Sequence, residues 1–311
     1  MEAVASAGSG SMEETVRRGP WRQAAGRFRR RPLGVAALAF VLVLLVVGLL
    51  APVLAPYQVG QIFVELVSRP QKPLAPGHLL GTDPLGRDFL TQLLWAVRET
   101  TVTGFFCAGL ATALGVVLGV LTGTVGGALE AAVASLSRVI VAVPAIIVLG
   151  YVSTREPTLL SPFQNALWVA LVLWPGVARV VAANVASLQG REFVEAAHAA
   201  GASRPRIVVR HLLPNLSGPI VVAATSLVAQ GVVVVATVQY LGFSANQSNS
   251  PTLGGLVADA TRAQQLVLSQ AVDLGGIWWL YVFPSALLVA LLLAVTFLGD
   301  VLDEALNPAA G

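Results

Sequence analysis

The sequence predicts an all-α membrane protein, a polytopic bundle of about six transmembrane helices, and three observations support this. Hydrophobic residues make up 56% of the 311 residues and charged residues only 11%, whereas soluble domains carry about 25% charged residues. Mean hydropathy is +0.77. Apolar runs recur from residue 33 to residue 300 without a long polar insert. A water-soluble fold could not bury that much apolar surface, so we expect one bundle in the bilayer.

The apolar runs are long enough to cross a hydrocarbon core of about 30 Å, which takes about 20 helical residues. A proline followed by glycine, Pro175-Gly176, predicts a kink in the fourth run. We expect spans at 33–54, 101–123, 137–153, 165–185, 219–241 and 277–298. The expected divisions are 1–32 (basic and cytoplasmic, its first 14 residues disordered), 33–54 (first span), 55–100 (extracytoplasmic loop and surface helix), 101–300 (core domain) and 301–311 (cytoplasmic tail).

The distribution of basic residues predicts that both ends of the chain are cytoplasmic. With the N-terminus inside, the inner segments hold 13 of the 19 Lys and Arg residues, seven of them between residues 17 and 31. Cytoplasmic loops carry such an excess. The net charge of +3 is therefore explained by membrane orientation, and we expect no nucleic-acid partner. We expect the N-terminal arginines to contact anionic membrane lipid.

The second span carries a stripe of glycines. Gly115, Gly119 and Gly123 follow a GxxxGxxxG pattern, which places them on one helix face. Glycines spaced in this way let the backbone of another helix come close. The stripe therefore predicts helix packing rather than chemistry.

The segment 191–215, REFVEAAHAAGASRPRIVVRHLLPN, reads as helix, turn, helix on the cytoplasmic side. Residues 192–200 are good helix formers, Gly201 suits a helix C-terminus, and Ser203 can cap a second helix whose first turn tolerates Pro205. We expect Leu212-Leu213-Pro214 to end that helix at the membrane. From composition alone, the segment can dock into a groove of another protein or lie on anionic lipid.

The residues of this segment resemble the EAA loop of permease subunits of bacterial ABC importers. The match lies in Glu195-Ala196-Ala197, then Gly201, then Leu213-Pro214. The neighbouring GAS, RIVVRH and LPN are typical of the peptide and nickel branch, in which His211 replaces an isoleucine. LGTDPLGRDFLTQLLWAVRETT (80–101) and FLGDVLDEALNP (297–308) are similar to segments of the C-type subunit of dipeptide or oligopeptide permeases.

This resemblance implies a type I ABC importer permease fold, with residues 101–300 as the permease domain and 191–215 as the loop that docks into an ATPase. The coupling residues it implies are Glu195, Ala196, Ala197, Gly201, Arg206, His211, Leu213 and Pro214. The implied partners are a B-type permease, one or two ABC ATPase subunits and an extracytoplasmic substrate-binding protein. The chain itself then needs no cofactor, because the ATPases bind ATP and Mg. The implied cargo is a peptide, with nickel chelates and haem as alternatives.

Other chemistries fit the sequence less well. GTDPLGRD has Arg87 and Asp88 where a phosphate-binding loop needs lysine and a hydroxyl residue. The histidines lack metal-ligand spacing, so we expect no metal site. A secondary transporter or channel is the alternative class, but no Asp, Glu or Lys lies near the middle of an expected span. Gln230 and Gln239 can line a translocation path or bond to a neighbouring helix.

Overall fold

The structure is a computed structural model that describes residues 20–155, 162–242, 250–268 and 276–306. Within these ranges the chain is helical, and its only β pairing is two isolated bridges. The helices are α2 (Pro20–Arg29), α3 (Pro32–Leu49), α4 (Ala51–Leu54), η1 (Val64–Leu66), α5 (Phe89–Val125), α6 (Gly127–Ala142), α7 (Ala145–Arg155), α8 (Pro162–Gln189), α9 (Glu192–Ala199), α10 (Arg204–Ile207), the π-helical η2 (Val208–Leu212), α11 (Leu213–Tyr240), α12 (Leu253–Leu268) and α13 (Trp279–Leu306). The expected disorder of the first 14 residues lies outside the described ranges.

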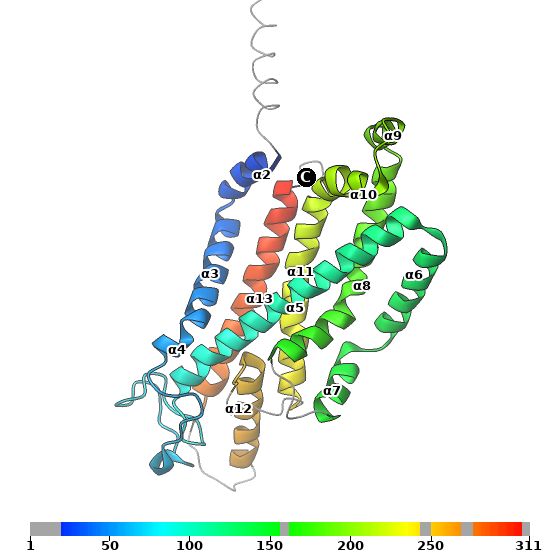
Figure 1. Cartoon of the computed structure of the whole chain (residues 1–311). Helices are drawn as coiled ribbons and strands as arrows, with labels where there is room; N and C mark the ends of the chain where they lie inside the picture. Colours follow the sequence, from blue (N-terminus) through cyan, green and yellow to red (C-terminus); the bar gives the residue numbers. More distant parts are fainter. Residues whose placement is uncertain (1–19, 156–161, 243–249, 269–275, 307–311) are drawn as a thin grey trace, which may run out of the picture.

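The prediction of about six spans is confirmed. Among the described residues, five helices are long and apolar enough to cross a membrane, and the number is six if α6 and α7 form one span. Figure 1 shows α2, α9, α10 and the C-terminal end of α13 at one end of the bundle. The segment 55–88 and α12 lie at the opposite end. We call these the elbow end and the far end.

The single span expected at 137–153 is wrong. Helix α6 begins ten residues earlier, at Gly127, and it meets α7 at an angle of 78°. The break falls at Pro144, which disfavours helical geometry in the residue before it. Val143 accordingly has extended angles, with φ −93° and ψ 122°.

The second span also differs from the expectation. In place of a surface helix followed by a span at 101–123, α5 runs for 37 residues without a break. No glycine or proline lies between Phe89 and Thr103 to interrupt it. Asp88 starts the helix, since its side chain accepts a hydrogen bond from the Thr91 backbone N–H at 2.8 Å. At 1.5 Å per residue α5 is about 55 Å long, longer than the hydrocarbon core.

The glycine stripe of α5 lies against α8. A Cβ built at Gly115 would come within 2.5 Å of Val177 Cβ, and one at Gly119 within 2.6 Å of the Ala178 carbonyl oxygen. At Gly123 the nearest atom, Val185 Cβ, would be 2.7 Å away. No side chain larger than hydrogen fits at such distances, so all three glycines let α8 approach α5.

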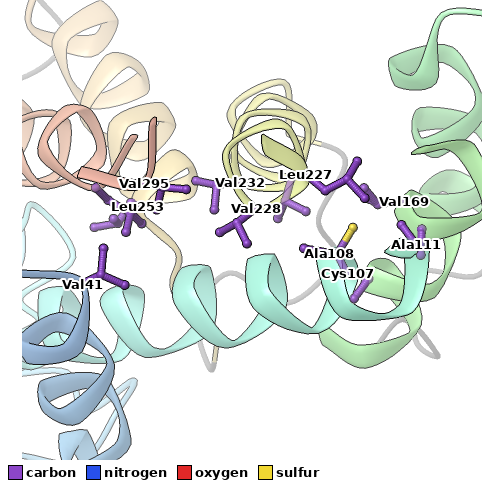
Figure 2. Packing of buried hydrophobic residues seen from close by; sticks show 14 of the residues in the cluster. Val41, Cys107, Ala108, Ala111, Val169, Leu227, Val228, Val232, Leu253 and Val295 are labelled. Carbon is purple, nitrogen blue, oxygen red and sulfur yellow. The ribbon is translucent and has the colours of Figure 1, made fainter. Parts of the chain in front are cut away.

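A second face of α5 packs on α11 in the centre of the bundle. Figure 2 shows Cys107 and Ala108 of α5 lying opposite Leu227 and Val228 of α11. Cys107 is fully buried, and a Cβ built at Gly231 of α11 would lie 3.3 Å from its Sγ. Helix α5 therefore packs against both α8 and α11, the two helices that extend to the elbow end.

Candidate functional site

The segment expected to dock with a partner forms an exposed elbow made of α9 and α10. Gly201 joins the two helices with φ +78°, a conformation that favours glycine. The Ala202 N–H donates to the Ala197 carbonyl at 3.0 Å, and the Gly201 N–H donates to that of His198 at 2.9 Å. These are the two hydrogen bonds of a Schellman motif. A Cβ at Gly201 would meet no atom within 4 Å, so backbone conformation, not crowding, calls for glycine here.

The inner residues of the elbow are buried in the core, and its outer residues are exposed. Val194, Ile207 and Leu212 are at most 3% exposed and join the main apolar core. The predicted coupling residues divide by exposure. Glu195, Ala196, Gly201, Arg206 and Pro214 are exposed, whereas Ala197, His211 and Leu213 are half-buried. The outer face therefore presents the small residues Ala196 and Gly201 between charged side chains, on helices whose inner residues are fixed in the core.

The second helix of the elbow does not end at the membrane, contrary to the expectation. Helix α10 passes into the π-helical turn at 208–212 and then directly into α11. Pro214 lies in the first turn of α11, directly after the π-helical turn. Ser203 occupies the N-cap position of α10, but its side chain makes no capping hydrogen bond. The elbow is thus continuous with a long membrane helix.

A cavity of about 950 Å³ lies beside the elbow, between α2, α8, α11 and α13. Its lining is mixed, with leucine, valine and proline side chains among polar ones. The polar residues of α8, α11 and α13 that line it are Asn184, Asn215, Ser217, Ser226, Gln230 and Asp303. Of the two glutamines predicted for a translocation path, Gln230 lines this cavity. Gln239 does not line it and is buried, 7% exposed, nearer the far end.

At the far end, sequence reasoning missed a network of charges around the buried Arg87. Arg87 is 3% exposed. Its Nε donates to Asp83 Oδ2 at 2.6 Å, and its Nη2 reaches Asp259 Oδ2 of α12 at 3.5 Å. Asp259 also accepts from Arg262 at 3.0 Å. Burial raises the pKa of Asp259, although the neighbouring Arg87 and Arg262 act to lower it. The segment GTDPLGRD, which resembles a phosphate-binding loop, therefore contacts α12 through Arg87 and helps to hold that helix in place.

His78 also lies at the far end, close to the charges around Arg87. It lies in the loop before α5 and is only 6% exposed. Its Nδ1 lies 2.9 Å from Asp88 Oδ1, and its ring packs near those of Tyr57 and Phe63. Asp88 thus joins the far-end loop to the start of α5. In the described ranges, no group of three or more His, Cys, Asp or Glu residues is arranged to hold a metal ion.

Helix α12 is inserted deeply at the far end. The Leu253 backbone N–H donates to Thr100 Oγ1 of α5 at 3.0 Å. A Cβ at Gly254 would lie 2.3 Å from the Ala236 carbonyl oxygen of α11, so the two backbones are in contact. Tyr281 of α13 donates its hydroxyl to the Ala260 carbonyl at 2.8 Å. Helices α5, α11 and α13 therefore all hold α12 in place.

Comparison with known proteins identifies this architecture. Residues 115–310 match the family model of the binding-protein-dependent transport system inner membrane component. Residues 19–73 match that of the N-terminal TM domain of oligopeptide transport permease C. The chain is 30% identical to the oligopeptide transport system permease protein OppC of Mycobacterium tuberculosis over 285 residues, 91% of this chain and 92% of that protein.

Two further relatives agree over almost the same length. The dipeptide transport system permease protein DppC of Haemophilus influenzae is 29% identical over 90% of this chain and 92% of its own. The glutathione transport system permease protein GsiD of Escherichia coli is 31% identical over 94% and 91%. The chain therefore belongs to the family of inner membrane components of binding-protein-dependent transport systems, as a multi-pass transporter subunit and not an enzyme.

Proposed function

We propose that this chain is the C-type permease subunit of an ATP-driven importer of peptides. Three relatives that match nearly the whole chain are named for oligopeptide, dipeptide and glutathione transport. Glutathione is itself a tripeptide, so the three cargoes share free carboxylates, an ammonium group and amide bonds. A small peptide is the cargo class that fits all three.

The observation that carries the proposal is the continuity between the exposed elbow and the cavity. Helix α11 begins at the elbow, and ten of the residues that line the cavity lie on it. A partner that pulls on α9 and α10 thereby acts on the cavity wall. We infer that ATP binding in the partner ATPase closes it, draws the elbow inward, and switches the bundle between two arrangements.

The proposed orientation places the elbow end in the cytoplasm. Six spans bring both ends of the chain to one side, and α2 and the end of α13 indeed lie together (Figure 1). Four arginines, Arg191, Arg204, Arg206 and Arg210, lie on or beside the elbow, and those of α2 lie at the same end. Their positive charge favours the cytoplasmic side and contact with anionic lipid.

Members of this family work with a second permease, an ATPase and a substrate-binding protein. For this chain we propose one B-type permease, one or two ABC ATPase chains that bind ATP and Mg, and an extracytoplasmic binding protein that delivers the cargo at the far end. Glu195, Ala196 and Gly201 are the proposed centre of the ATPase contact, because they are exposed on the elbow.

Affinity purification of the chain in mild detergent tests the proposal. A second permease and an ATPase should co-purify, and reconstituted complex with its binding protein should take up labelled trialanine when ATP is supplied. In Gly201→Asp, which places a carboxylate at the centre of the proposed ATPase contact, both ATPase recovery and peptide-stimulated ATP hydrolysis should be lost while the chain stays inserted. Recovery of a stable homo-oligomer without a nucleotide-binding partner, or unchanged stimulation in the variant, would contradict the proposal.

A further inference from the structure

Helix α2 forms part of the cavity wall at the elbow end. Its Ala24 is 6% exposed, and Gln23 and Arg27, four residues apart on one face, line the cavity. Just beyond the helix, Arg31 pairs with Glu304 of α13. The N-terminal segment is thus held at the end of α13 by Arg31, while Arg27 forms part of the cavity wall.

The guanidinium of Arg27 has an enclosed donor without an acceptor. Its Nη1 is shielded from solvent and donates no hydrogen bond within the part of the chain that the structure describes. A positively charged donor removed from water is unfavourable unless an acceptor meets it, and an anion is the most favourable acceptor. The Arg27 side chain lines the cavity, which has room for such an anion, and a rotation of the guanidinium would bring this donor to it.

The remainder of the cavity suits the other groups of a peptide. Its volume of about 950 Å³ lies at the upper end of the range of about 300–1,000 Å³ for small-molecule sites. Ser226 and Gln230 lie further along α11 and offer acceptors and donors. The Asn215 carbonyl lacks its usual helical donor, because Pro219, four residues on, has no N–H. These groups can meet an ammonium group and peptide N–H groups.

We propose that Arg27 binds a carboxylate of the peptide in the inward-facing cavity, as a specificity-determining residue at the cytoplasmic exit. This inference rests on the proposed function, because it takes the cargo as a peptide and the elbow end as cytoplasmic. The binding protein selects cargo before entry, and Arg27 then acts on cargo that has crossed the bundle. A lipid phosphate offers the same anionic chemistry, and the experiment separates the two sources.

The test is inhibition from the inside in proteoliposomes that contain the whole transporter. Uptake of labelled trialanine from the binding-protein side is measured with unlabelled trialanine or trialanine amide in the lumen. In the wild type, trialanine should inhibit uptake at about tenfold lower concentration than the amide, the loss expected for one charge-assisted hydrogen bond. In Arg27→Gln, trialanine should become about tenfold weaker and equal to the amide. Arg29→Gln, which removes an exposed charge from the same helix outside the cavity, should behave as the wild type.

Three outcomes would overturn the inference. One is a preference for the free carboxylate that persists in Arg27→Gln, and another is a wild type that luminal trialanine does not inhibit. The third is an Arg27→Gln effect that disappears in vesicles without anionic phospholipid, which would assign Arg27 to lipid phosphate. A wild type that takes up no peptide at all would instead refute the proposed function, and this inference with it.

Discussion

Replacement of Gly119 by alanine is expected to destabilise the bundle, and Gly109 supplies a matched control in the same helix. A Cβ at Gly119 would lie 2.6 Å from the Ala178 carbonyl oxygen and 2.7 Å from Val181 Cβ, both on α8. At Gly109, which is exposed, a Cβ would meet no atom within 4 Å. Both glycines lie inside α5, so the gain in helix propensity of about 1 kcal/mol from alanine is common to the two variants.

The difference between the two variants therefore measures the packing of α5 on α8. Added carbon in a well-packed interior costs about 1–3 kcal/mol. The cost at Gly119 should lie near the middle of that range, because the nearest atom is a backbone oxygen that cannot rotate aside. We expect Gly119→Ala to be about 2 kcal/mol less stable than Gly109→Ala.

Unfolding of the purified chain in mixed micelles, with increasing fractions of a denaturing detergent, provides the measurement. Gly109→Ala should unfold at or above the detergent fraction of the wild type, and Gly119→Ala clearly below it. Both variants should insert into the membrane in equal amounts. Equal unfolding midpoints for the two variants would show that α8 can move away from α5 at little cost, and would refute the reasoning.

Three further predictions concern the far end and the elbow. Asp83→Asn should lower the free energy of unfolding by about 3 kcal/mol, since it leaves buried Arg87 without its nearest carboxylate, whereas Asp259→Asn should cost much less in the same unfolding assay. Because burial raises the pKa of Asp259, its contribution to stability is present at about pH 4 and falls as pH rises through that raised pKa. As pH rises, the unfolding midpoint of Asp259→Asn should therefore increase relative to that of the wild type, and a pH-independent difference would contradict this. Gly201→Asn should retain peptide-stimulated ATP hydrolysis and Gly201→Val should lose it, because asparagine tolerates a positive φ and valine does not; equal rates would show that conformation is unimportant there.

Features that depend on local sequence were the ones that sequence reasoning could predict. Long apolar runs identify spans because the bilayer sets the length of a helix. Gly201 was assigned to a helix C-terminus because its role is a local backbone conformation, and its φ of +78° agrees with that. The break in the span expected at 137–153 is also local, since Pro144 restricts the residue before it. The sequence therefore contained the signal for this break, although the expectation placed one span across it.

Features that depend on distant partners could not be predicted. Arg87 reads as a loop charge in the sequence, and its partner on α12 lies 172 residues away. Helix α12 has 16 residues, too few to span, so hydropathy gives no sign that Leu253 is buried to 1%. Its insertion depends on the backbone contact that Gly254 permits with α11. The paired charges Asp83 and Arg87, four residues apart, are the one signal that a search for ion pairs could have used.

The position of Pro219 separates the part of α11 that can follow the elbow from the part that cannot. On the far-end side of the proline, Val228 and Val232 are buried in the core, and a Cβ built at Gly104 of α5 would lie 2.5 Å from Val232 Cγ2. On the elbow side of the proline, α11 is continuous with the π-helical turn and, through it, with the exposed elbow. Because Pro219 removes one helical hydrogen bond, bending costs least at this level. A pull on the elbow should therefore tilt the segment 208–218 and change the width of the cavity, while the contact between α5 and α11 stays fixed.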